Sequence, residues 1–158
     1  MTIGIGERCR DCLLSIDLKK YKIVINAGVC GSVNPQLNLF ETIIPSKITL
    51  TTKSSTVIPL NIPDNINAFK KNLTLGTSPE PVLSKTEKEK LYSLGIDIID
   101  MECFFIAEKY PYVIPIKVVT DTPETSENLK SHLSNIGKGL EILKNQTAKI
   151  IEMLIENT

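Results

Sequence analysis

Short apolar runs alternate with amphipathic or polar segments along most of this chain, and this alternation limits its fold more than any other feature. KIVINA (22–27) and VIPIKVVTD (113–121) have the length and composition of buried strands. Three runs between residues 40 and 60, and IDIID at 96–100, predict further strands. Strands that alternate with helices favour an α/β fold: a three-layer α/β/α arrangement around a mainly parallel or mixed central sheet.

Helices are predicted between and after these strands. Ser84 opens SKTE, a capping box with Glu87, so the sequence predicts a helix over 84–94. ECFFIAEKY (102–110) predicts another helix, beginning at Glu102, whereas 61–81 is loop-rich with LTLGTS as a possible strand. The tail from Ser126 predicts a long amphipathic helix laid on the sheet. Its apolar stripe is Leu129, Leu133, Ile136, Leu140, Leu143, Thr147, Ile150 and Leu154.

Composition narrows the classes of function. The 158 residues are most simply one domain, 1–158, with formal net charge zero and no block of like charge, which argues against nucleic-acid binding. No apolar run is long enough to span a membrane and no signal-peptide pattern is present, so a cytoplasmic protein without a membrane partner is expected.

The cysteines do not predict a metal or redox centre. Cys9 and Cys12 form the one CxxC, and His132 is the one histidine, so a zinc set is not expected and no cofactor is predicted. Cys9 and Cys12 share one face of a predicted helix over 7–18, where we interpret them as small core residues.

Three polar clusters follow predicted strands: AGVCGS (27–32), Asp-Met-Glu (100–102) and Thr-Asp-Thr-Pro-Glu (120–124). In α/β sheets, ligands bind beyond the carboxyl ends of the strands, which makes these clusters candidates for one site. Each cluster alone also has a simpler structural interpretation. Glu102 suits a helix N-terminus, Asp121 suits a turn or N-cap, and the glycines suit a tight turn.

Taken in order, the three clusters resemble motifs of the nucleoside phosphorylase/nucleosidase superfamily. GIGERCRDCLL…YKIVINAGVCGSVNPQLNLFETIIPS is similar to its glycine-rich block, GIDIIDMECFFIAE to its Met-Glu block, and IPIKVVTDTPE to its Ser-Asp block. The resemblance runs from Ile3 to the final helix and is nearest to methylthioadenosine/adenosylhomocysteine nucleosidase and the hopanoid-associated phosphorylase. It implies cleavage of the N-glycosidic bond of a purine nucleoside.

The resemblance also implies a role for each site residue. Glu102 would accept hydrogen bonds from the ribose 2′- and 3′-hydroxyls, and Met101 would pack on the sugar face. Asp121 would be the catalytic acid that passes a proton to N7 of the purine, with Thr120 in the place of the serine that positions it. The wall beside the sugar would be formed by Val29, Cys30 and Gly31.

The chain departs from this family at several positions. Met1–Gly6 aligns with a block that normally follows several strands, which carry the first phosphate-contacting loop or, in nucleosidases, the acid that activates water. Lys117 replaces the usual arginine, and the usual glycine-aspartate pair is replaced around Phe40-Glu41. Three hypotheses remain: a diverged active enzyme, a non-catalytic nucleoside-binding or structural member, and a chain whose missing strands are encoded upstream.

Asn26 and Val29 stand where phosphorylases tend to have an arginine and a serine, so hydrolysis is favoured over phosphorolysis, with phosphate kept as a possible co-substrate. The expected partner is a small-molecule nucleoside. The missing strands would leave a sheet edge, so a rearranged edge or a homo-oligomer is expected.

Overall fold

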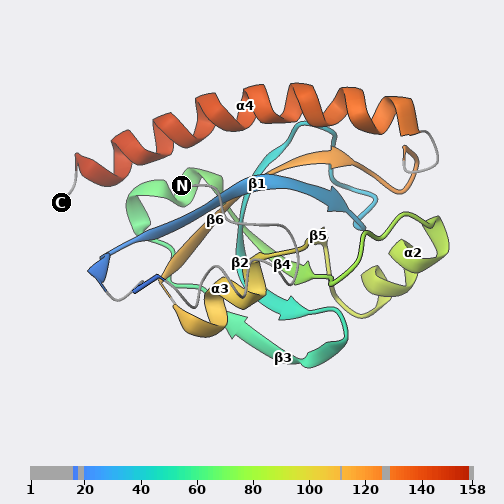
Figure 1. Ribbon diagram of the computed structural model, residues 1–158, viewed down its shortest axis with the longest axis horizontal. Coiled ribbons are helices and arrows are strands. Elements are labelled where there is room, and N and C mark those ends of the chain that lie inside the picture. The colour runs from blue at the N-terminus through green and yellow to red at the C-terminus, as the bar shows by residue number, and fades with distance from the viewer. Residues whose placement is uncertain (1–15, 18–19, 111, 126–128, 157–158) are drawn as a thin grey trace.

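The computed structural model describes residues 16–17, 20–110, 112–125 and 129–156 (Figure 1). Along the chain the elements are β1 (Val24–Ser32), β2 (Thr42–Leu50), β3 (Lys53–Pro59), the 3-10 segment η2 (Asp64–Phe69), β4 (Lys70–Thr77), α2 (Lys85–Ser93), β5 (Ile98–Asp100), α3 (Cys103–Lys109), β6 (Val113–Asp121) and α4 (Leu129–Ile155). The strands form one sheet in the order β3-β2-β4-β5-β1-β6. The α/β fold class predicted from the sequence is confirmed.

The sheet is mixed and closes on itself. β1 runs parallel to β6, and β4 runs parallel to both β2 and β5, whereas β1–β5, β2–β3 and β2–β6 are antiparallel pairs. β2 reaches two partners because its register shifts between Pro45 and Lys47: Thr42 and Ile43 pair with β6, and the following residues pair with β4. Such an irregularity bends a strand. The edge of β6 is therefore covered by β2.

The chain enters β2 through an unusual backbone conformation. Phe40 has φ 66°, in the left-handed region that favours glycine. Its N–H donates to the carbonyl of Val119 at 2.8 Å, and the N–H of Val119 donates to the carbonyl of Glu41 at 3.1 Å. The family resemblance predicts a glycine-aspartate pair at about this position, and this chain has Phe40 there in the conformation that favours glycine.

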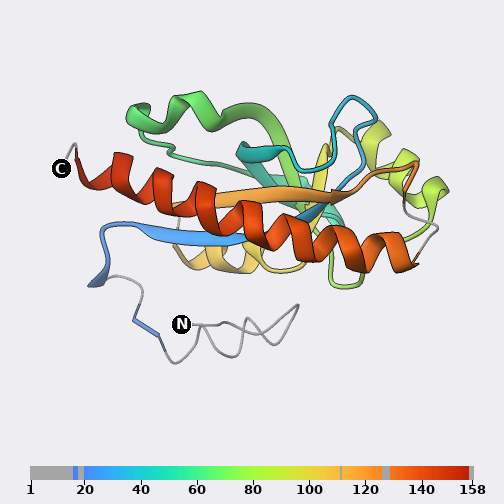
Figure 2. The same cartoon turned by 90° about the horizontal axis from the view of Figure 1, so that it is seen from above.

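Helices lie on both sides of the strands. α4 crosses above β1 and β6 and contacts both of them as well as η2, while α3 packs below against β2, β4 and β6 (Figure 1). Figure 2 shows α4 running along nearly the whole length of the molecule. The carboxyl ends of β1 and β6 point towards the end of the molecule where α2 lies.

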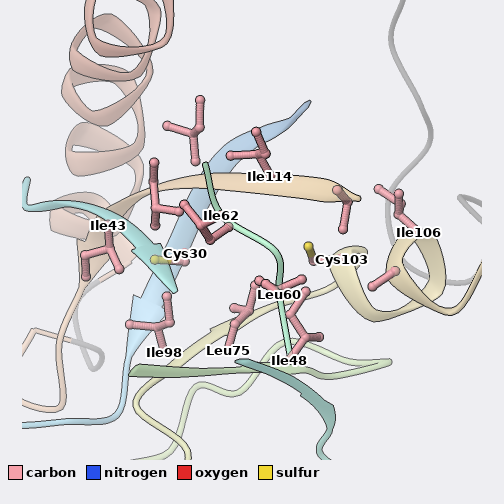
Figure 3. Close-up of a cluster of buried hydrophobic side chains, with 14 of the residues drawn as sticks. Cys30, Ile43, Ile48, Leu60, Ile62, Leu75, Ile98, Cys103, Ile106 and Ile114 are labelled. Atoms are coloured by element: carbon pink, nitrogen blue, oxygen red, sulfur yellow. The ribbon is translucent and has the colours of Figure 1, made fainter. Parts of the chain in front are cut away.

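The hydrophobic core fills the space enclosed by the curved sheet and α3 (Figure 3). All nine residues of β6 are buried, as expected of a central strand covered on both faces. Side chains from most strands and α3 complete the cluster, among them Ile43, Ile48, Leu75, Ile98, Cys103, Ile106 and Ile114.

The predicted glycine turn after residue 27 is wrong. β1 continues through AGVCGS to Ser32, and neither Gly28 nor Gly31 has the positive φ that a glycine turn requires. The glycines are instead positions of close approach: a Cβ on Gly28 would lie 3.4 Å from Nζ of Lys117. The useful property of these glycines is therefore that they have no side chain, and not that they allow the backbone to bend.

Several other predictions needed adjustment. The region 40–60 contains two strands rather than three, and 61–81 contains η2 and a full strand, β4. The helix over 84–94 is confirmed as α2, with Ser84 as its N-cap accepting from the N–H of Glu87. The helix predicted over 7–18 lies almost entirely outside the described residues.

The apolar stripe of α4 packs on the sheet only in its C-terminal half. Leu143, Ile150 and Leu154 are buried, but the side chains of Leu133 and Leu140 are 61% and 51% exposed. In the N-terminal half of the helix, Ile136 and Leu140 overhang a cavity, and Gly139 packs against Thr120 of β6.

Candidate active site

A cavity of about 700 Å³ opens at the carboxyl ends of β1, β5 and β6. Its walls come from β1, the loop after β4, the start of α3, the end of β6 and the overhanging part of α4. All seven predicted site residues line it: Val29, Cys30, Gly31, Met101, Glu102, Thr120 and Asp121. Residues separated by more than 90 positions in sequence thus meet at one place, as the position of the three polar clusters at strand ends predicted.

A bulge in β6 directs Asp121 into this cavity. Cys30 pairs with Val119, but the next residue of β1, Gly31, pairs with Asp121, so Thr120 is an extra residue without an opposite partner. Side chains alternate between the two faces of a regular strand, and one extra residue reverses that alternation. Asp121 therefore lies against Gly31 on the opposite face from Lys117.

Gly31 makes room for the carboxylate of Asp121. A Cβ on Gly31 would lie 3.0 Å from both carboxylate oxygens of Asp121, closer than most real contacts. On its other side the carboxylate forms an ion pair with Nζ of Lys88, a residue of α2 that is completely buried. Asp121 is thus buried between a strand backbone and a lysine, which is more than a turn or N-cap residue requires.

A second buried ion pair supports the Met101-Glu102 segment. Nζ of Lys117 lies 2.8 Å from Oδ2 of Asp100, and neither side chain is accessible to solvent. Asp100 also accepts from the hydroxyl of Thr77 at 2.7 Å and from the N–H of Cys103 at 3.1 Å, which caps the first turn of α3. This network fixes the break between β5 and α3, where Met101 and Glu102 lie.

The ammonium of Lys117 is bound within that network through its ion pair with Asp100. Burial alone would lower the pKa of Lys117, but the charge of Asp100, its hydrogen bond and the charge of Glu102 outweigh burial and raise the pKa above its ordinary value. Lys117 therefore stays protonated.

Glu102 occupies the N-cap position of α3, yet its side chain makes no capping hydrogen bond, and Asp100 performs that role. Glu102 therefore stands at the helix N-terminus, as its structural interpretation predicted, but it does not supply the capping hydrogen bond. The side chain is half-buried and lines the cavity. A carboxylate in that place can accept two hydrogen bonds from a ligand diol.

Cys30 lines the cavity, and its thiol is not a nucleophile. Burial raises the pKa of Cys30 well above its ordinary range, so the thiol remains protonated at neutral pH. Cys103 is also buried and belongs to no disulfide, while Cys9, Cys12 and their CxxC lie outside the described residues.

Sequence reasoning missed Lys88. Asn26, one of the two positions where phosphorylases tend to have an arginine and a serine, also lines the cavity. Lys88 lies three residues before Leu91, the other buried residue of α2, and that helical spacing was a signal that it faces inward. Oδ1 of Asn26 is buried and has no hydrogen-bond partner within the described part of the chain. Such an acceptor is available to a ligand.

Within the described residues, no cluster of three or more histidine, cysteine or acidic side chains is placed to hold a metal ion. A membrane-crossing helix is likewise absent from that part of the chain, because none is both long and apolar enough.

Neither a protein-family model nor a curated protein sequence matches this chain. Solved structures do match. A 5′-methylthioadenosine/S-adenosylhomocysteine nucleosidase of Chlamydia trachomatis, bound to 5′-methylthioadenosine (MTA), superposes with a TM-score of 0.66 at 21% identity over 84% of this chain. Futalosine hydrolase of Helicobacter pylori gives a TM-score of 0.75 at 16% identity over 98% of this chain. A variant of the Helicobacter pylori nucleosidase, with 5′-methylthioadenosine in its active site, gives a TM-score of 0.63 at 15% identity over 90% of this chain.

The chain has the fold of these nucleosidases.

The predicted resemblance is thus confirmed at the level of the fold. The chain spans 65% of the Chlamydia trachomatis protein, 77% of the futalosine hydrolase and 78% of the Helicobacter pylori nucleosidase. At these identities the superpositions concern the fold alone, and the chemistry that the cavity can perform follows from its own side chains.

Proposed function

We propose that the cavity binds a purine nucleoside and hydrolyses its N-glycosidic bond. The observation that carries this proposal is that Glu102 and Asp121, one at the start of α3 and the other at the end of β6, line a single cavity with every other predicted site residue. The match to nucleosidase structures, two of them solved with methylthioadenosine, supports the same class of substrate.

In this proposal the two carboxylates have different tasks. Glu102 accepts hydrogen bonds from the ribose 2′- and 3′-hydroxyls, which orients the sugar with Met101 against its face. As the bond between C1′ and the base nitrogen breaks, its electrons go to the base, and a proton from Asp121 at N7 neutralises the leaving group. Water then adds to C1′ of the electron-poor sugar and loses a proton to solvent.

Water is favoured over phosphate as the nucleophile. Val29 offers no polar atom beside the sugar, and the ammonium of Lys117 is already bound to Asp100. Phosphate binding needs cations or free backbone donors, and these two positions of the described cavity supply neither.

A second candidate is a protein that binds nucleosides without cleaving them. The observation in its favour is that the resemblance assigns no residue of the described lining to activate the water. Ribose recognition and base recognition are both accounted for, but nucleophile activation is not.

Base release separates the two candidates. The full chain is incubated with methylthioadenosine, adenosine and inosine, with and without phosphate, and free base is measured. The proposal predicts release that does not depend on phosphate and is lost in Asp121→Asn and in Glu102→Gln, with Glu89→Gln on the exposed face of α2 as the matched control. Binding without release of any base would support the second candidate and reject hydrolysis.

A further inference from the structure

The ammonium of Lys88, which the motifs do not include, is built into the site through Asp121. We propose that Lys88 is a positioning residue that orients the carboxylate of Asp121 and stabilises it after it has given its proton to the base. This inference rests on the proposed function, because Lys88 acts through a residue that would touch the base.

The first observation is where Lys88 lies. In α2 the neighbouring charged side chains, Glu87, Glu89 and Lys90, are exposed, whereas Lys88 is fully buried together with Leu91. An apolar residue would be expected on this inward face. A buried ammonium is costly unless it is paired and hydrogen-bonded, so the partners of Lys88 explain its presence.

Both partners of Lys88 belong to the end of β6. Nζ donates to Oδ2 of Asp121 and also lies 3.4 Å from the carbonyl oxygen of Thr122. The N–H of Thr122 in turn donates to the hydroxyl of Thr125 at 2.8 Å. Lys88 therefore ties α2 to the residues that immediately follow the bulge of β6.

Gly31 restricts the position of the Asp121 carboxylate on the side away from Lys88. Because a Cβ at Gly31 would already lie 3.0 Å from both oxygens, the carboxylate occupies a narrow slot between β1 and Lys88. Binding of Oδ2 by Lys88 fixes the rotation of this carboxylate and hence the direction of Oδ1. Fixed geometry of this kind is what proton transfer at a defined base nitrogen requires.

Lys88 has a second effect during the reaction. Asp121 takes up a proton from solvent on Oδ1 before the bond breaks, while Oδ2 keeps its contact with Lys88. When this proton passes to N7, the carboxyl group becomes an anion again beside an ammonium that keeps all its own protons. Opposite charges in a buried site attract strongly, so the product of the transfer is stabilised. No other group is consumed, and the electrons of the broken glycosidic bond leave with the base.

The test compares Lys88→Met, which keeps length and removes charge, with Lys90→Met on the exposed face of the same helix. We expect Lys88→Met to lower kcat by about 10- to 100-fold with KM changed by less than about threefold, because orientation matters most in the transition state. Lys88→Cys alkylated with 2-bromoethylamine restores an ammonium of similar length and should recover most of kcat, with equally treated wild type as the control. Unchanged kcat in Lys88→Met, or no recovery by the restored ammonium, would overturn the proposal.

A double variant covers the case in which Lys88→Met does not fold. Lys88→Met/Asp121→Asn has no unpaired buried charge, and in the Asp121→Asn background the loss of Lys88 should have no further effect on adenine affinity. An additional loss of about tenfold there would show that Lys88 does not act through Asp121.

The two proposals fail in different ways. If wild type releases no base, the proposed hydrolysis fails, and Lys88 is then judged by calorimetry with adenine. The positioning role predicts at least about tenfold weaker adenine binding in Lys88→Met than in Lys90→Met, since the Asp121 contact to the base is lost. Equal adenine affinity in the two variants would reject the role of Lys88.

Discussion

Lys117 and Asp100 illustrate how single residues hold the site. Their ion pair is closed to solvent, and Asp100 also receives hydrogen bonds from Thr77 and from the N–H of Cys103. A buried pair of this kind is weak support for overall stability, but removing one partner leaves a buried charge alone. Its main effect is to fix the position of Met101 and Glu102.

Lys117→Met is therefore expected to lower the free energy of unfolding by about 3–5 kcal/mol, because Asp100 loses its counter-ion. Urea unfolding followed by circular dichroism measures this. The double variant Lys117→Met/Asp100→Asn removes both charges and should be more stable than the single variant. A single variant as stable as the double one would show that the pair does not hold the turn.

Glu41 gives a pH-dependent prediction. Burial alone would raise the pKa of Glu41, but hydrogen bonds from Lys71 and from the N–H of Asn38, with the charge of Lys71, lower the pKa below 4.5. A depressed carboxyl pKa contributes stability above its unfolded value, and this contribution is lost as pH falls through the folded value.

Glu41→Gln should thus cost up to about 1 kcal/mol near pH 7, since the pair is partly exposed, and less at about pH 3, because the contribution declines as the carboxylate becomes protonated. Urea unfolding of both proteins at the two pH values measures the difference. An equal difference in the free energy of unfolding at both pH values would contradict the role of the ionised carboxylate.

At the scale of elements, the predictions succeeded where local signals and tertiary packing agree. The capping box of α2, the apolar run of β6 and the break at Asp100-Met101-Glu102 all appear as predicted. The start of β1 was predicted, but its end was not, because glycine serves both in turns and in close packing and the sequence alone does not distinguish the two. The bulge at Thr120 was not visible in the sequence because it depends on pairing with β1.

The same limit applies to individual site residues. Asp121, Glu102 and the wall of β1 could be found because their order matches a known family. For Lys88, the helical spacing from Leu91 indicates an inward-facing position but not a role. The acid that pairs with Lys88 is 33 residues away along the chain, so the pair depends on the tertiary structure.

Two glycines of α4 test how tightly this helix packs beside the site. A Cβ on Gly137 would meet nothing within 4 Å, whereas a Cβ on Gly139 would collide with Cγ2 of Thr120. Gly137→Ala should raise the free energy of unfolding by about 1 kcal/mol through helix propensity. Gly139→Ala gains the same propensity but must displace Thr120, so it should lower stability and also base release.

Thermal unfolding and base release measured on the two alanine variants check this contrast. Equal stabilisation by both substitutions would show that α4 does not lie against Thr120 as described.

At the scale of the whole molecule, the closed strand ring explains how a chain shorter than its structural neighbours encloses a core. β2 pairs with β3, β4 and β6, which leaves β6 buried along its full length. The single domain over 1–158 and the homo-oligomer both stay predictions. Leu83 and Leu140 are exposed where they line the cavity, and analytical ultracentrifugation measures whether the chain forms an oligomer.

The central claim is that one cavity binds a purine nucleoside through Glu102 and Asp121. A crystal structure of the Asp121→Asn variant soaked with methylthioadenosine tests it most directly, because this variant is expected to bind without cleaving. The account predicts a nucleoside in the cavity with its ribose hydroxyls on Glu102 and its base beside residue 121. A cavity without the nucleoside at saturating concentration, or a ribose turned away from Glu102, would contradict it.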